Sequence, residues 1–100
     1  MISDPTYCVY ILASRPCGAL YVGVTSDLVN RVLKHRERVF DGHTSKYGIT
    51  ILVWYQGFAR IEDAIAFEKR LKRWRRAWKI ELVEKTNPDW RDLWQDVAGA

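Results

Sequence analysis

The feature that most constrains the fold is a pair of short apolar segments on either side of a turn. The first segment, YCVYILA (Tyr7–Ala13), is rich in β-branched and aromatic residues and is too short for a buried helix. The stretch SRPCG follows, and its Pro16 and Gly18 interrupt regular structure. The second segment, ALYVGVT (residues 19–25), is again typical of a strand. The pattern predicts a β-hairpin.

Each strand of this hairpin carries a tyrosine, Tyr10 in the first and Tyr21 in the second. Because alternate residues of a strand point to opposite faces, the pairing register decides whether the two phenols share a face. Paired residue numbers that sum to an odd value place Tyr10 and Tyr21 on the same side, and an even sum separates them. The sequence leaves both registers open.

A basic helix is predicted directly after the hairpin. In TSD (residues 25–27) a side-chain oxygen can accept a free N–H group of the first helical turn, so we expect a helix over residues 28–40. Its apolar stripe consists of Val29, Val32 and Leu33. Arg31 and His35 are four residues apart and lie one turn along the same side. Arg31 lies near the helix start, where backbone N–H groups favour an anion, and this position suits a phosphate.

The rest of the chain predicts one more strand and further helices. A polar loop over residues 41–48 precedes a strand at 49–58, which is apolar on both faces and is therefore expected to be well covered. Helices are expected at about 60–75, at 77–86 and, for a turn or two, at 90–97. There is no repeat and no linker, so one domain over residues 1–100 is predicted.

One acidic residue, Glu68, falls on the side of the second helix that is predicted to be packed. At about 100° per residue, the apolar side chains of this helix occupy one arc that also contains Glu68; they are Ala64, Ile65, Phe67, Leu71, Trp74 and Trp78. A buried carboxylate is costly unless it is paired or bound to a cation. Three alternatives remain open: an ion pair with a neighbouring Lys or Arg, a position at the helix edge, or a metal ligand.

A run of positive charge follows on the same helix. Its residues predicted to contact nucleic acid are Lys69, Arg70, Lys72, Arg73 and Arg76, and Lys46 in the polar loop would extend this surface. The run is single-signed and contributes much of the net charge of +4, which favours contact with phosphates, although a solvated helix face explains it equally well. Trp74 and Trp78 within the run are expected to belong to the core rather than to stack on bases.

Other functional classes find little support. Cys8 and Cys17 are nine residues apart, which matches neither a CxxC pair nor half of a zinc site, so reduced thiols are expected. No signal-peptide pattern opens the sequence, and no apolar run approaches the roughly 20 residues needed to cross a bilayer. A cytoplasmic protein without a membrane partner is expected.

The sequence resembles the GIY-YIG nuclease domain family. CVY (residues 8–10) stands at the first tripeptide of that family and YVG (residues 21–23) at the second, and Arg31, His35 and Glu68 stand at matching later positions. The segments TSKYGITILVWY and AIAFEKRLKRWRRAWKIELVEKTNPDW are similar to the small stand-alone bacterial members. The resemblance covers nearly the whole chain. The departures, Cys8 for a glycine and Val22 for an isoleucine, carry no chemistry.

The resemblance implies an α/β (α+β) fold, with a small three-stranded antiparallel sheet flanked by helices. It also implies hydrolysis of phosphodiester bonds in DNA, dependent on one Mg²⁺ (or Mn²⁺) ion. Mg²⁺ keeps most of its waters and often takes only one or two protein carboxylates, so Glu68 alone would suffice as its ligand. The ion would polarise the scissile phosphate and stabilise the leaving oxygen.

The resemblance also implies a role for each site residue. Tyr21 is the candidate general base, directly or through the attacking water, and Arg31 would neutralise charge on the phosphate. Tyr10 would orient the water or Tyr21, and His35 would take a proton from Tyr21 or hold the phosphate. A phenol with an ordinary pKa near 10 needs a nearby cation, and the sequence does not identify one. The late Asn87 is left out of the catalytic set.

An alternative is a nucleic-acid-binding module of the same fold in which cleavage is weak or lost. A third hypothesis, a protein–protein adaptor using Trp90 and Trp94, has no other support. A chain this small reads a DNA shape such as a branch, flap or single strand more readily than a long base sequence, so structure-selective cleavage is expected. The oligomeric state stays open.

Overall fold

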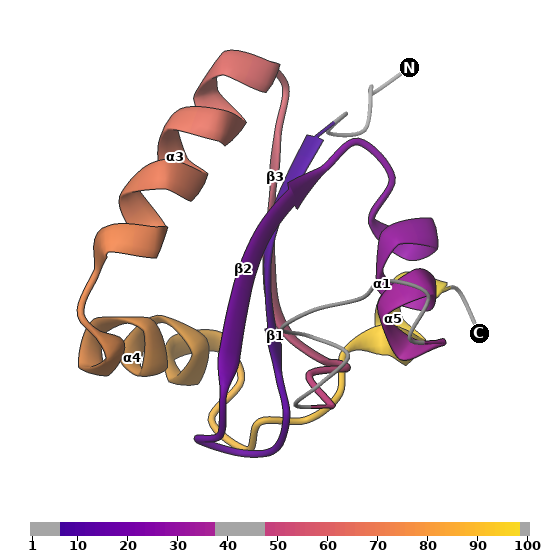
Figure 1. Cartoon of the computed structure of the whole chain (residues 1–100), viewed down its shortest axis with the longest axis vertical. Helices are drawn as coiled ribbons and strands as arrows, with labels where there is room; N and C mark the ends of the chain where they lie inside the picture. Colours follow the sequence, from indigo (N-terminus) through magenta and orange to yellow (C-terminus); the bar gives the residue numbers. More distant parts are fainter. Residues whose placement is uncertain (1–6, 38–47, 99–100) are drawn as a thin grey trace.

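The computed structural model describes residues 7–37 and 48–98. Its centre is an antiparallel sheet with strand order β2-β1-β3, as Figure 1 shows. The strands are β1 (Tyr7–Ala13), β2 (Leu20–Thr25) and β3 (Ile51–Phe58). The described helices are α1 (Leu28–Arg36), α3 (Ile61–Arg73), α4 (Arg76–Thr86) and α5 (Trp94–Ala98). The predicted fold class, a three-stranded antiparallel sheet flanked by helices, is confirmed.

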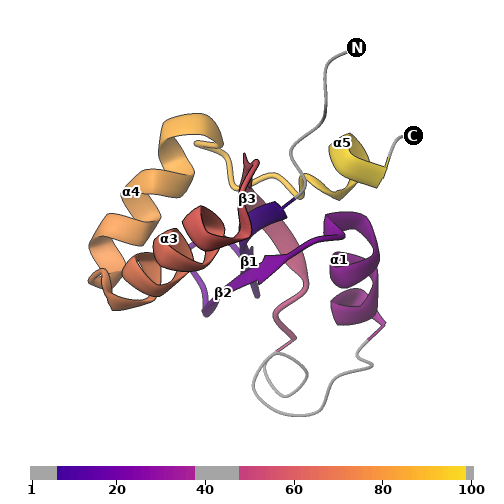
Figure 2. The same cartoon turned by 90° about the horizontal axis from the view of Figure 1, so that it is seen from above.

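Helices cover both faces of the sheet. Seen from above, α3 and α4 lie on one face and α1 and α5 on the other (Figure 2). The core is divided accordingly. The larger cluster beneath α3 and α4 includes Val9, Ile11, Trp54, Leu71 and Val83. The smaller cluster, on the α1 side, consists of Tyr10, Leu12, Val32, Ile49 and Leu52.

The hairpin register is the odd one, and it brings the two tyrosines together. Tyr10 pairs with Gly23, and Leu12 pairs with Tyr21. Since residues 10 and 12 point to the same face of β1, Tyr10 and Tyr21 both point to the α1 side of the sheet. The register question that the sequence left open is therefore answered in favour of a shared site.

Three expectations about burial are wrong. Val29 and Leu33 are exposed, because α1 meets the sheet through a narrower stripe that contains Val32 and His35. The strand β3 is covered only in its first half, and Tyr55 in its second half is exposed. Ile65 on α3 is exposed as well, since this helix covers the sheet through Ala64, Glu68 and Leu71.

The second helix also ends earlier than predicted, which changes the position of Trp78. Helix α3 ends at Arg73, and Trp74 has an extended backbone with ψ of 144°. A new helix, α4, begins at Arg76 and runs in another direction (Figure 1). The helical projection that placed Trp78 on the packed arc fails across this break. The side chain of Trp78 is 49% exposed, so its assignment to the core is wrong.

The C-terminal segment is held by a turn rather than by an early helix. Asn87 is buried, and its amide donates to the carbonyls of Val53 (3.1 Å) and Arg91 (2.8 Å). Trp90 is buried with a positive φ of 57°, so helix α5 begins only at Trp94. Asn87 thus joins strand β3 to the C-terminal segment.

Both cysteines of the chain are free thiols. Cys8 is partly buried, and Cys17 is exposed. Within residues 7–37 and 48–98, no helix has the length and apolar character required to span a membrane.

Candidate active site

Three aromatic side chains meet on the α1 side of the sheet. The ring centroids of Tyr21 and His35 are 5.3 Å apart. The ring centroid of Tyr10 lies 6.3 Å from that of Tyr21 and 6.2 Å from that of His35. The phenolic oxygen of Tyr10 is 3.4 Å from Nε2 of His35, a long hydrogen bond. The strands supply the two phenols and α1 supplies the imidazole. The cluster thus depends on the odd register and on the docking of α1.

Gly23 makes room for the Tyr10 ring. A Cβ atom on Gly23 would lie 2.5 Å from both Cζ and the phenolic oxygen of Tyr10. The ring of Tyr10 therefore lies directly over the backbone of its neighbour in β2, and only glycine permits this approach. Gly23 belongs to the YVG tripeptide, so its place in that motif was the sequence signal for this role, although it was not assigned to the site.

Burial and charge hold Tyr10 in its protonated form. The side chain has no exposed surface, and desolvation raises the pKa of its phenol well above the ordinary value. The neighbouring Tyr21 raises this pKa further, whereas the charge of Arg31 and its side-chain hydrogen bond lower it. The negative charge of Glu68 again raises it. Four of the predicted site residues, Tyr10, Tyr21, Arg31 and Glu68, are thus linked through their effects on the pKa of the Tyr10 phenol.

His35 is held in its neutral form. The residue is buried, and this burial lowers the pKa of the imidazole below its ordinary value. The positive charge of Arg31 lowers it further. A protonated phenol and a neutral imidazole share one hydrogen bond, and the tautomer of His35 decides which of the two donates. His35 therefore contributes no second positive charge beside Arg31.

The start of α1 is closed by an aspartate. Asp27 is the N-cap, as predicted, and its carboxylate accepts a hydrogen bond from the backbone N–H of Asn30 at 3.1 Å. The N–H group of Asn30 therefore already has a partner within the protein. The carboxylate of Asp27 occupies the end of the helix where a phosphate was expected. The group suited to a phosphate here is the partly buried guanidinium of Arg31, one helical turn further on.

Glu68 lies on α3, which covers the face of the sheet opposite to the aromatic cluster (Figure 2). Its side chain is buried, with 8% exposure, as the helical projection predicted. The carboxylate forms an ion pair with Lys72, one turn later on the same helix. Of the three alternatives for Glu68, the ion pair with a neighbouring lysine is the one that the structure contains. The negative charge of Glu68 is the smallest of the effects on the pKa of Tyr10, which it raises.

These residues fit a single hard divalent cation, but they do not form a complete cage. In the described part of the chain, no group of three or more His, Cys, Asp or Glu side chains is gathered as a metal site. Glu68 offers one buried carboxylate, and Lys72 occupies it through a side chain that is 53% exposed and can move away. Mg²⁺ is commonly held by one or two carboxylates together with waters and substrate phosphates. The donor set is compatible with such an ion.

The predicted nucleic-acid-binding residues lie along α3 and its end. The side chains of Lys69, Arg70, Lys72, Arg73 and Arg76 are exposed. Arg76 has a structural contact that the sequence did not predict: its Nη2 donates to the carbonyl oxygens of Cys17 and Gly18 in the hairpin loop, at 2.5 and 2.6 Å. Lys46 lies outside the described residues.

Comparisons with known proteins agree with this architecture. Residues 6–81 match the family model of the GIY-YIG catalytic domain. The UPF0213 protein of Aeromonas salmonicida (strain A449) is 29% identical over 89 residues, which cover 87% of this chain and 65% of that protein. The UPF0213 protein of Streptococcus pneumoniae serotype 4 is 32% identical over 77 residues, or 77% of either chain. This chain thus spans less than two thirds of the length of the Aeromonas relative.

A solved structure shows the same fold. The solution NMR structure of the UPF0213 protein from Bacillus halodurans superposes with a TM-score of 0.54 at 28% identity, and the match covers 89% of this chain and 94% of the other. The family model and the shared fold define a domain of the GIY-YIG catalytic type. The chain belongs to the GIY-YIG family, among its small UPF0213-type members.

Proposed function

We propose that this protein is a metal-dependent endonuclease that hydrolyses phosphodiester bonds in DNA, with residues 1–100 acting as one catalytic domain. The observation that carries the proposal is the cluster of Tyr10, Tyr21 and His35 on the α1 side of the sheet, with the charges of Arg31 and Glu68 acting on the pKa of Tyr10. Membership of the GIY-YIG family supports it.

The two tyrosines have different roles in this proposal. Tyr10 is fully buried and its raised pKa keeps the phenol protonated, so it cannot act as a base. Tyr21 is partly exposed and can reach a water molecule. Tyr21 therefore takes the proton from the attacking water as it passes its own phenolic proton to the neutral imidazole of His35. Tyr10 fixes the positions of Tyr21 and His35 through ring contacts and its hydrogen bond.

Arg31 binds the phosphate, and His35 accepts a proton or a hydrogen bond. The planar guanidinium of Arg31 binds two phosphate oxygens and stabilises the negative charge that develops on them. His35, neutral because of burial and of Arg31, accepts a proton or a hydrogen bond from the phenols beside it. Burial has the largest effect on the pKa of both Tyr10 and His35, and the charge of Arg31 lowers each of them.

Glu68 would hold one Mg²⁺ or Mn²⁺ ion after it exchanges its partner Lys72 for the metal. When bound, the ion supplies Lewis-acid polarisation of the phosphate and stabilisation of the leaving oxygen. The displaced ammonium of Lys72 would then be available to a neighbouring phosphate of the substrate.

DNA is the proposed substrate because exposed cations line the helix that carries Glu68. Lys69, Arg70, Lys72 and Arg73 lie within five positions of it in the sequence, so a backbone that enters the site passes over them. Their contacts with phosphates carry no base information, so the protein selects substrates by shape, such as a branch or a flap.

Cleavage of a labelled DNA panel tests the proposal. Perfect duplex, single strand, flap and four-way junction are incubated with Mg²⁺ or with EDTA. Cleavage should require Mg²⁺, should be lost in Glu68→Gln, and should be kept in Glu62→Gln, which removes an exposed carboxylate of the same helix. Salt-sensitive binding of DNA by all three proteins, without Mg²⁺-dependent cutting, would favour the alternative, a binding module of the same fold.

A further inference from the structure

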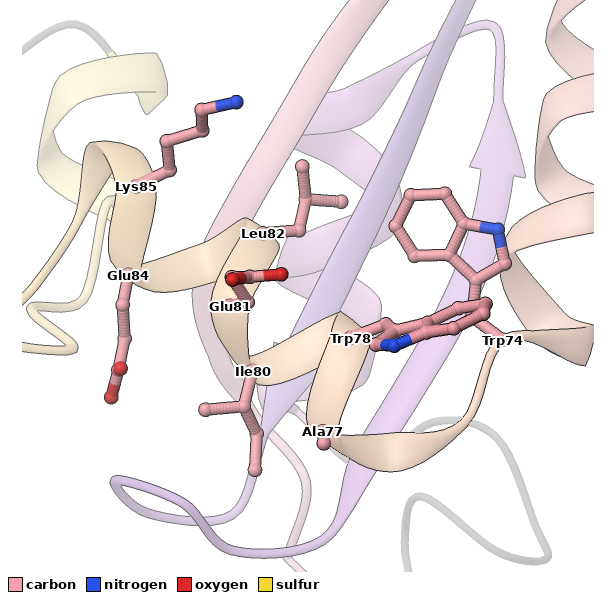
Figure 3. Close-up of a pocket in the computed structure, with 8 residues that line it drawn as sticks. All are labelled: Trp74, Ala77, Trp78, Ile80, Glu81, Leu82, Glu84 and Lys85. Carbon is pink, nitrogen blue, oxygen red and sulfur yellow. The ribbon is translucent and has the colours of Figure 1, made fainter.

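The exposed indole of Trp78 is the large apolar group on α4 that packing does not explain. Trp78 is 49% exposed, and the guanidinium of Arg75 lies 4.9 Å from its ring centroid. The indole of Trp74 packs against it in an edge-to-face arrangement, with ring centroids 6.2 Å apart and an interplanar angle of 84°. Figure 3 shows the two indoles against each other at the beginning of α4. The indole of Trp78 is thus held in place while much of its surface faces solvent.

Cations lie between Glu68 and this indole. Lys72 pairs with Glu68, and the ammonium group of Lys79 donates to the carbonyl oxygen of Lys72 at 3.4 Å. Lys69, Arg70, Lys72, Arg73 and Arg75 are exposed, and no acidic residue interrupts the sequence between them. The C-terminal end of α3 and the start of α4 therefore form a basic stretch that favours contact with phosphates.

Both signs of charge follow Trp78 along α4. The pocket in Figure 3 is lined beyond the indoles by Glu81 and Glu84 and also by Lys85. From Lys69 to Lys79 every charged side chain is basic, whereas acidic and basic side chains are mixed after Lys79. A phosphate backbone is therefore favoured most along the stretch that ends beside Trp78.

We propose that Trp78, backed by Trp74 and flanked by Arg75 and Lys79, is a stacking platform for an unpaired base of the substrate strand. This inference rests on the proposed nuclease function and names a feature of its substrate, a single-stranded segment next to the cleavage point. Aromatic side chains beside a positive track bind single strands in this way, since every base offers a π-face. The sequence had suggested that Trp78 belongs to the core, and the proposal assigns it to substrate binding instead.

The spacing suits such a substrate. Glu68 and Trp74 are six residues apart, which corresponds to about 9 Å of helix at 1.5 Å per residue. The ring of Trp78 lies beside that of Trp74. At about 3.4 Å per nucleotide in a stacked strand, the platform lies within a few nucleotides of the carboxylate. A short unpaired segment can therefore contact both.

Binding in EDTA tests the platform separately from cleavage. Fluorescence anisotropy of labelled oligo(dT) is measured with the wild-type protein, Trp78→Leu, Trp78→Phe and Leu33→Ala. Leu33 is an apolar side chain on α1, across the sheet, with an exposed fraction of 38%. Trp78→Leu should weaken binding about tenfold, because base stacking on an aromatic ring is lost. Trp78→Phe and Leu33→Ala should stay close to wild type, and circular dichroism should show all four proteins folded.

Three results would overturn the proposal. The first is equal affinity of wild type and Trp78→Leu for oligo(dT). The second is a loss of affinity in Trp78→Leu that Trp78→Phe shares, which would show that stacking is not the cause. Self-association of the wild type that Trp78→Leu abolishes, with unchanged oligo(dT) binding, would assign the indole to contact with a second copy and would also contradict it. Failure of the nuclease function appears separately, as absence of Mg²⁺-dependent cutting.

Discussion

Tyr10 and Gly23 face each other across the hairpin so closely that a Cβ atom on Gly23 would lie 2.5 Å from the phenolic oxygen of Tyr10. The contact places the phenol over the neighbouring strand and within hydrogen-bond distance of His35. A glycine at this position thus serves the geometry of the site rather than a turn, because β2 is an ordinary strand there.

Gly23→Ala should destabilise the protein by about 1–3 kcal/mol, since the Tyr10 ring is fully buried and has little room to shift. The free energy of unfolding is measured in urea, for Gly23→Ala alone and in a Tyr10→Leu background. The cost of the alanine should be clearly smaller when the ring is absent. Equal costs in both backgrounds would show that the two residues do not compete for space.

His35 should titrate below the ordinary value near 6.5, because burial and the charge of Arg31 lower its pKa. Its ring signals are followed by NMR between pH 4 and 8. Arg31→Met should raise this pKa, whereas Arg36→Met, which removes a guanidinium paired with Asp92, should change it less. A pKa at or above the ordinary value would contradict the neutral role of His35.

The same shift predicts a pH dependence of stability. The folded state binds fewer protons than the unfolded state between the lowered pKa and about 6.5, so the unfolding free energy from this group should fall as the pH drops through that window. Above it, His35 is neutral in both states and contributes no slope. His35→Gln should remove this component in urea titrations at several pH values. An unchanged slope in His35→Gln would refute the assignment.

The affinity of the protein for Mn²⁺ should depend on the ion pair between Glu68 and Lys72. Lys72→Met should increase the affinity for Mn²⁺ several-fold, because the carboxylate no longer exchanges one cation for another. Glu68→Gln should abolish the binding, and Lys69→Met, at an exposed neighbour, should have a smaller effect. Isothermal titration calorimetry without DNA gives these affinities. Weaker binding by Lys72→Met would mean that Glu68 is not the ligand.

The contact between α4 and the hairpin should stabilise the fold. Arg76→Met removes the donor to the carbonyls of Cys17 and Gly18 and should lower the unfolding free energy by about 1 kcal/mol. Arg73→Met, on the exposed last turn of α3, should cost less. Urea denaturation compares the two. Equal losses would show that the loop contact contributes nothing measurable.

Local signals in the sequence predicted much of this fold. The strand Tyr7–Ala13 and the N-cap Asp27 lie where side-chain type and capping chemistry placed them. The register of the hairpin could not be predicted, because it depends on the packing of both faces. The burial of Glu68 followed from helical periodicity, and its ion pair with Lys72 is a local contact at a spacing of four residues.

The errors arise where tertiary contacts override local pattern. Two separate helices were predicted at about 60–75 and 77–86, close to the observed α3 and α4, but a single helical projection was continued across the break to Trp78. Because the chain turns at Trp74, Trp78 does not continue the packed face of α3, and its side chain is exposed. Arg76 also contacts a hairpin loop nearly sixty residues away in the sequence, which no local pattern predicts. Gly23 was also missed as a site residue, since its role depends on the ring that lies across it.

The most direct test of the central claim is single-turnover cleavage of a labelled branched DNA with Mg²⁺ by Tyr21→Phe and by Tyr7→Phe. Tyr7 is a matched control, because it belongs to β1 but packs on the opposite face of the sheet. Tyr21→Phe should cut at least about 100-fold more slowly, the usual loss when a general base is removed, and Tyr7→Phe should cut at nearly the wild-type rate. Cleavage by Tyr21→Phe within a few-fold of wild type would contradict the assignment of this site as the catalytic centre.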